Sequence, residues 1–172
     1  MGKVAIQMAI KPIRTGDDPV LKQKAKEVSK FDDRMERLIN NMLDTMYDAG
    51  GIGLAAPQIG ILKRVIVVDN REEEGEEEGH LYKLINPEIV ETSREEETSI
   101  EGCLSFPGVQ GEVTRPKEIT VKACDINGEE IEIKADGLLA RVIQHEVDHL
   151  EGEVLVNKAE KLYRSEGTAD HV

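Results

Sequence analysis

Residues 137–152 read GLLARVIQHEVDHLEG, and this stretch decides how the rest of the chain is interpreted. Six of its apolar residues cover most of the circumference of a helix: Leu138, Leu139, Val142, Ile143, Val147 and Leu150. A helix that is apolar nearly all round is usually enclosed by the rest of its domain. The pattern therefore predicts a buried central helix, which Asp136 caps at its start and Gly152 ends.

The same stretch contains the HExxH pattern, His145 to His149. Residues four apart lie on one face of a helix, so both imidazoles can reach one metal ion. Glu146 is turned from His145 by about 100°, and it can lean toward the same site and take a proton from a water there. Asp148 falls on another face and is interpreted as a surface or helix-end charge. The pattern indicates a metal-dependent hydrolase.

A catalytic metal site normally has three protein ligands, so a third must come from elsewhere in the chain. Cys103 is the leading candidate because it sits in the compact segment EGCLS, residues 101–105. The alternatives from downstream of the helix are Glu166 and His171. Cys124 lies inside a predicted strand and is interpreted as a structural thiol.

A second helix and several strands are predicted around this centre. From Phe31 to Tyr47 the apolar residues follow helical spacing, with Asp32 or Asp33 as the N-cap and Gly50-Gly51 as the stop. Residues 63–69 (KRVIVVD) predict a strand, and residues 81–85 predict the returning strand, ended by Asn86-Pro87. Residues 118–134 alternate around Asn127-Gly128 and predict a hairpin.

The expected fold class is therefore α+β, with antiparallel strands and hairpins around a central metal-binding helix and a helix nearer the N-terminus. The length of 172 residues fits one catalytic domain, residues 1–172. Within it, residues 71–79 (REEEGEEEG) predict a solvated acidic loop, because adjacent glutamates repel one another. Residues 157–172 predict a short polar tail of one or two helical turns that ends in disorder.

Charge excludes some classes of partner. Lys plus Arg is 22 and Asp plus Glu is 35, which leaves a formal charge of 22 − 35 = −13. A general nucleic-acid binder or a binder of anionic membranes needs surplus positive charge, so neither direct sequence-specific nucleic-acid binding nor membrane binding is expected. Two cysteines are too few for a disulfide framework, and no secretory signal is expected. These features predict a cytoplasmic protein.

The third motif is GIGLAAPQ, residues 51–58. Its glycines lack Cβ and let the backbone approach a ligand closely, although the segment does not match a phosphate-binding loop. The ordered triple GIGLAAPQ, EGCLS and QHEVDHLEG resembles the peptide deformylase family. The resemblance covers roughly residues 12–156.

The resemblance implies a role for each matching residue. The metal ligands would be Cys103, His145 and His149. Glu146 would act as general base and then general acid, and Gln58 with the backbone N–H of Leu104 would donate to the developing oxyanion. The substrate-binding backbone would come from Gly51, Ile52 and Gly53, and Arg115 would pair structurally with Glu101.

The resemblance also implies the reaction: removal of the N-formyl group from formylmethionine at the start of new polypeptides, with release of formate. The cofactor would be one divalent ion, with Fe²⁺ expected as the native metal and Zn²⁺, Ni²⁺ or Co²⁺ able to replace it. Ribosome-associated nascent chains in a bacterial-type cytoplasm would supply the substrate. The alternatives are a general HExxH metallopeptidase, and a catalytically silent relative that binds formyl-peptides or metal.

Overall fold

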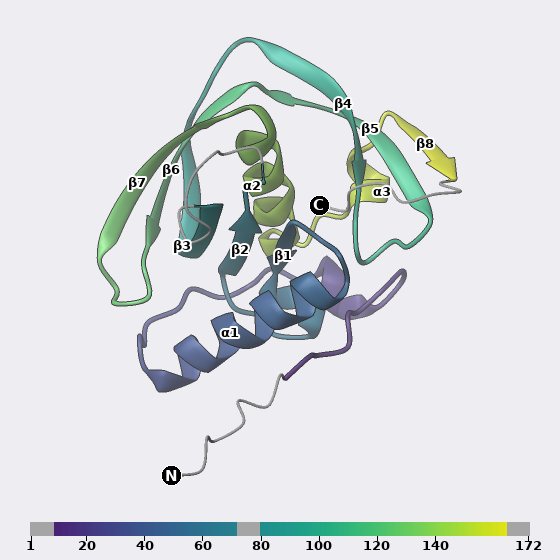
Figure 1. The fold of residues 1–172 in the computed structure, drawn as a ribbon. Helices are drawn as coiled ribbons and strands as arrows, with labels where there is room; N and C mark the ends of the chain where they lie inside the picture. The colour runs from purple at the N-terminus through teal and green to yellow at the C-terminus, as the bar shows by residue number, and fades with distance from the viewer. Residues whose placement is uncertain (1–8, 72–79, 165–172) are drawn as a thin grey trace.

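A computed structural model describes residues 9–71 and 80–164 (Figure 1). The helices are α1 (Asp33–Asp48), α2 (Gly137–Leu150) and the short α3 (Leu155–Lys158), with 3-10 turns at Pro19–Lys22 and Ala56–Ile59. The strands are β1 (Gly53–Ala55), β2 (Val65–Asp69), β3 (Leu81–Thr92), β4 (Glu96–Gly102), β5 (Val109–Pro116), β6 (Glu118–Cys124), β7 (Glu130–Asp136) and β8 (Lys161–Arg164).

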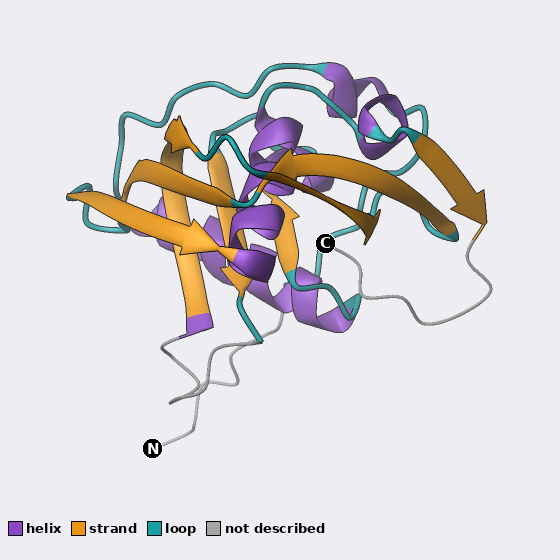
Figure 2. Cartoon of the chain, turned by 90° about the horizontal axis from the view of Figure 1, so that it is seen from above, coloured by secondary structure: helices purple, strands orange, loops and turns teal. Residues whose placement is uncertain are grey.

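The strands form two antiparallel sheets that surround α2. One sheet has the order β1-β2-β3-β6-β7, and the other has the order β4-β5-β8. Helix α2 contacts strands of both sheets, while α1 contacts β1 and β2. Figure 1 shows α2 in the middle of the molecule with α1 below it, and Figure 2 shows the same arrangement from above. The predicted α+β class with a central helix is confirmed.

Strand β2 explains why the first sheet is covered on both faces. Ile66 and Val68 pack in the core cluster that includes α2, whereas Val65 and Val67 pack in the cluster that includes α1. All four side chains are fully buried, and burial of each contributes roughly 1.5–3 kcal/mol. The sequence of this strand is continuously apolar because the strand lies between two helices and both of its faces are buried.

Both predicted helices are present. Asp32 is the N-cap of α1, where its carboxylate accepts hydrogen bonds from the backbone N–H groups of Arg34 and Met35. Helix α2 is buried along most of its length, as its composition predicts. Asp136 occupies the N-cap position of α2, but its side chain makes no capping hydrogen bond there, which differs from the prediction.

The returning strand does not end at Asn86-Pro87, because β3 continues to Thr92. The pairing with β6 shifts register between Ile85 and Glu88, so Pro87 lies in a bulge where no ladder N–H is required. Asn86 adopts a φ of 52°, and its carboxamide pairs with both the N–H and the C=O of Val28. The predicted break is therefore a bulge inside a longer strand.

Four strands are not predicted from the sequence: β4, β5, β8 and the three-residue β1. Strand β4 is exposed over its first five residues and strand β8 is mostly exposed, so neither shows an apolar run. Strand β5 alternates in burial, but its buried residues are Gly111, Val113 and Arg115, so the sequence shows no apolar alternation. Strand β8 falls within the predicted polar tail, where Lys161 pairs with Glu112 of β5. The hairpin around Asn127-Gly128 is confirmed, as β6 and β7.

Residues 72–79 of the predicted acidic loop and residues 165–172 of the predicted tail lie outside the described residues. Among the helices that are described, none is long and apolar enough to cross a membrane.

Candidate metal-dependent active site

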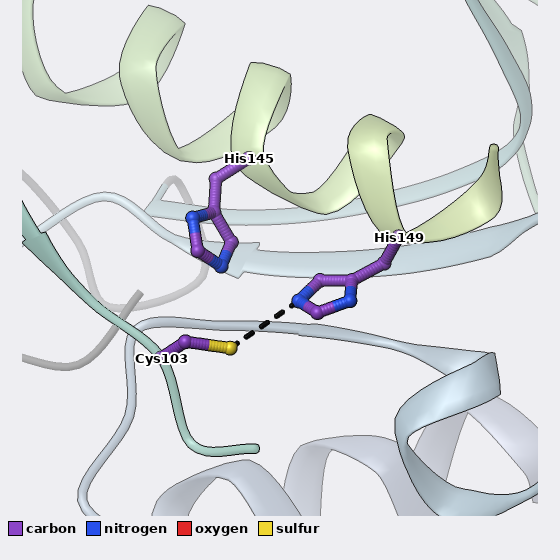
Figure 3. A group of neighbouring side chains, drawn as sticks. All are labelled: Cys103, His145 and His149. Atoms are coloured by element: carbon purple, nitrogen blue, oxygen red, sulfur yellow. Dashed lines mark hydrogen bonds between the residues drawn. The ribbon is translucent and has the colours of Figure 1, made fainter. Parts of the chain in front are cut away.

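Three potential ligands converge at the centre of the molecule. Cys103 follows β4, and His145 and His149 lie one turn apart on α2 (Figure 3). One donor atom from each of the three residues lies within 4.8 Å of the other two, and Cys103 Sγ is 3.4 Å from His149 Nε2. All three side chains are buried. The structure thus brings together the three residues expected to bind the metal.

The buried polar atoms here fit a cation. Among the residues that the structure describes, His145 Nε2 and both carboxylate oxygens of Glu146 have no hydrogen-bond partner. Each such atom costs free energy unless something satisfies it. A thiolate and two imidazoles are a donor set that divalent transition metals prefer. The alternative ligands Glu166 and His171 lie outside the described residues.

Glu101 holds His145 in place. Its Oε1 is 2.9 Å from His145 Nδ1, and Arg115 donates to both carboxylate oxygens from Nε and Nη2 at 2.7 and 2.9 Å. Arg141 also donates to Glu101. Burial raises the pKa of Glu101, but its hydrogen bonds with His145 and Arg115 outweigh this and lower the pKa to about 2. The ionised Glu101 carboxylate accepts a hydrogen bond from Nδ1–H of His145. This fixes the tautomer and leaves Nε2 free to bind a metal.

The expected pairing of Arg115 with Glu101 is therefore present, whereas Arg141 was not anticipated. Asp148, interpreted from the sequence as a surface or helix-end charge, lies in the last turn of α2. Its carboxylate accepts a hydrogen bond from Arg115 at 2.8 Å, and its side chain is only 20% exposed. It thus extends the network around Glu101.

The surroundings of the two histidines shift their pKa values in opposite directions. Burial, with the positive charges of His145 and Arg115, lowers the pKa of His149 well below its ordinary value. Burial also lowers the pKa of His145, but the neighbouring Cys103 sulfur and the Glu101 carboxylate outweigh it and raise the pKa well above its ordinary value. His149 is thus neutral and ready to bind a metal, whereas at His145 a proton and a metal ion compete for Nε2.

Glu146 is fully buried beside β1. Burial raises the pKa of its carboxyl group to about 7. A Cβ added to Gly53 would lie 2.8 Å from Glu146 Oε1 and 2.7 Å from Val142 Cγ1. Gly53 therefore permits a close approach of the carboxylate to the backbone of β1. The sequence predicted such an approach for a ligand, not for this side chain.

Gly53→Ala is expected to lower kcat by roughly 10²-fold with the metal retained, because the new methyl group displaces the Glu146 carboxylate and small misplacements carry costs of this size. Steady-state kinetics and metal analysis of the same sample measure both effects. Val142→Ala in the Gly53→Ala background is the control, since it removes only the contact with Val142. Recovery of the rate in that double variant would show that Glu146 had not been displaced.

Gln58 lies against the cysteine segment. Its Oε1 accepts a hydrogen bond from the backbone N–H of Ala55 at 3.0 Å, and its Nε2 donates to Ser105 Oγ at 3.1 Å and contacts Cys103 Sγ at 3.7 Å. Within residues 9–71 and 80–164, the backbone N–H of Leu104 donates no hydrogen bond. Both predicted oxyanion donors thus lie next to the candidate metal ligand.

The segment expected to bind a peptide backbone, residues 51–53, leads into β1, which begins at Gly53. Strand β1 is an edge strand of its sheet, paired only with β2 among the described strands. The carbonyl of Ile52 accepts a hydrogen bond from Asp69 N–H at 2.8 Å, so this group already has a partner. A Cβ on Gly51 would lie 2.7 Å from Leu104 Cδ1. The structure thus packs Gly51 against the cysteine segment.

The chain matches known proteins over most of its length. Residues 10–165 match the model of the polypeptide deformylase family. The peptide deformylase of Natranaerobius thermophilus is 63% identical over 159 residues, which cover 92% of this chain and 98% of that one. The peptide deformylase of Carboxydothermus hydrogenoformans is 52% identical and covers 91% of this chain, with 98% of its own length covered.

Solved structures with the same fold lead to the same family. The crystal structure of peptide deformylase from Thermotoga maritima superposes with a TM-score of 0.82 at 42% identity, covering 88% of this chain and 99% of that one. The Synechococcus elongatus enzyme in complex with actinonin gives 0.81 at 46% identity, covering 92% and 85%. The chain belongs to the peptide deformylase family, metal-dependent hydrolases that remove the formyl group from N-terminal formylmethionine.

Proposed function

We propose that the catalytic work of this deformylase is divided among the residues of the site described above. Cys103, His145 and His149 hold the metal ion, and Glu146 transfers the proton. Gln58 and the N–H of Leu104 donate to the oxyanion. The observation that supports this division best is the fully buried Glu146 carboxylate, which lacks a hydrogen-bond partner in the described structure and interacts electrostatically with the candidate ligand His145.

Cys103, His145 and His149 would hold a divalent ion, which would supply an activated water and Lewis acidity to the reaction. Glu146 is the group that accepts a proton. A pKa of about 7 suits both directions of transfer, since the carboxylate can take a proton from the water and return it to the amine that leaves. The returned proton prevents expulsion of an amide anion, and the products are formate and a free α-amine.

The charge that develops on the formyl oxygen needs donors on the protein. Gln58 Nε2 and Leu104 N–H are fixed beside Cys103 before substrate arrives, so they require no reorganisation during the reaction. Loss of one such donor typically costs about 3 kcal/mol of transition-state stabilisation. The site thus provides a proton-transfer group and two donors that are already in position.

We assign substrate binding to Gly51, Ile52 and Gly53. Because β1 is an edge strand, an extended peptide can add beside it through backbone hydrogen bonds. Backbone recognition is independent of side chains, which suits an enzyme that must process many different new polypeptides. The formyl group would then lie toward Cys103 and Glu146.

The native ion is proposed to be Fe²⁺, with Zn²⁺, Ni²⁺ and Co²⁺ as functional replacements. One thiolate and two imidazoles accommodate all four ions, so the choice in the cell depends on supply as well as on the ligands. Nascent chains at the ribosome in a bacterial-type cytoplasm are the proposed source of substrate, because formylated N-termini arise there.

Release of formate from formyl-Met-Ala-Ser by anaerobically purified protein tests the proposal, with metal content measured on the same sample. We expect turnover with about one ion per chain. Acetyl-Met-Ala-Ser is the control, because its extra methyl group tests the fit of the small formyl group. A metal-loaded protein that binds the formyl peptide without releasing formate would contradict the proposal and favour a silent binder.

A further inference from the structure

Both ends of the Gln58 carboxamide are fixed by protein groups. A backbone N–H can only donate, so the atom that faces Ala55 N–H at 3.0 Å must be the carbonyl oxygen Oε1. The amide nitrogen Nε2 therefore faces Ser105 and Cys103. This assignment follows from the hydrogen bonding alone, and it makes Ser105 Oγ the acceptor of the 3.1 Å hydrogen bond.

An amide nitrogen carries two hydrogens, and Ser105 takes one of them. The contact from Nε2 to Cys103 Sγ is longer, at 3.7 Å. The second hydrogen of Nε2 is the one donated to Cys103 Sγ in this longer hydrogen bond, so it lies on the side of the candidate metal ligands. This N–H can instead donate a hydrogen bond to the substrate oxygen.

The backbones of Gln58 and Ser105 are joined by one segment near the N-terminus. Arg14 N–H donates to the carbonyl of Gln58 at 2.7 Å, and Gly16 N–H donates to the carbonyl of Ser105 at 2.9 Å. The separation of the two residues is thus set by the main chain. What remains free is the rotation of the Gln58 side chain, and the hydroxyl of Ser105 restricts it. Both side chains are fully buried.

We propose that Ser105 is a positioning residue for the reaction: its hydroxyl orients the Gln58 carboxamide so that one N–H is aimed at the developing oxyanion. The inference rests on the proposed role of Gln58 as an oxyanion donor. Ser105 itself touches neither the substrate nor the proton that is transferred. Its effect must therefore appear in the rate of the chemical step and depend entirely on Gln58.

Ser105→Ala tests this directly. The variant is expected to lose roughly 10- to 100-fold in kcat, with little change in KM, because a donor that is present but poorly aimed is worth less in the transition state. Metal content should equal that of the unmodified enzyme. Ser105→Thr keeps the hydroxyl and should recover most of the rate. An unchanged kcat in Ser105→Ala would overturn the proposal.

A double-mutant cycle with Gln58→Ala separates positioning from general packing. In the Gln58→Ala background, adding Ser105→Ala should change kcat by less than about 2-fold, because the group that Ser105 orients is already gone. If the two losses multiply instead, Ser105 acts independently of Gln58 and the proposal fails. Near-normal kcat in Gln58→Ala alone would refute the oxyanion role itself, and the two failures are thus distinguishable.

Discussion

Replacement of Glu146 by glutamine is expected to lower kcat by roughly 10³-fold or more, because the protein then has no group to carry the proton from water to the leaving amine. The metal should remain bound, since neither oxygen of Glu146 belongs to the three-atom ligand group. Glutamine has nearly the same shape, so no cavity forms on this fully buried side of α2. The expected signature is an intact, metal-loaded protein with very slow turnover.

The measurement combines kcat, metal per chain and melting temperature on one preparation of Glu146→Gln. Glu132→Gln is the matched control: Glu132 is an exposed residue of β7 that forms no salt bridge with any residue the structure describes, so the same change of charge should leave the rate intact. A Glu146→Gln enzyme with metal and near-normal kcat would remove this residue from the proposed mechanism.

Replacement of Cys103 by alanine is expected to abolish both metal binding and turnover. It removes the one ligand outside α2, and two imidazoles alone hold a divalent ion far more weakly than a three-ligand site. Metal content should fall from about one ion per chain to a small fraction of that. Metal analysis after gel filtration, with the deformylation rate of the same sample, measures the effect.

Cys124→Ala is the matched control for that experiment. Cys124 lies in β6 and is half-buried against the cluster that includes α1, away from the three-atom ligand group. Its variant should keep both the metal and the activity. A fully metallated Cys103→Ala, or a metal-free Cys124→Ala, would show that the ligand had been assigned to the wrong thiol.

The two helices could be predicted because each carries a local pattern that the structure keeps. The apolar spacing of α2 and the Asp32 cap of α1 are properties of short segments. Strand β4 could not be found in this way. Its exposed, charged start gives no apolar alternation, and it is a strand because β5 pairs with it along its whole length.

The same distinction applies to the site. The convergence of Cys103 with His145 and His149 could be predicted, because HExxH is a local pattern and Cys103 lies in a recognisable segment. The contact between Gly53 and Glu146, the hydrogen bond from Gln58 to Ser105 and the bond from Arg141 to Glu101 join residues that are 40 or more positions apart. No local pattern encodes such contacts, so only the folded chain reveals them.

The placement of the ligands on separate parts of the fold makes the metal ion a cross-link. Cys103 belongs to a small apolar cluster with Val113 of β5 and Leu155 of α3, whereas α2 is anchored mainly in the core of the five-stranded sheet. An ion that joins Cys103 to His149 closes a loop of chain whose ends are 46 positions apart. Such an ion binds the folded chain and is released on unfolding, so it would stabilise the fold by mass action, by about 4 kcal/mol when the free ion is at about 1,000 times its Kd. Oxidation of one sulfur atom would then silence the reaction and also open this loop.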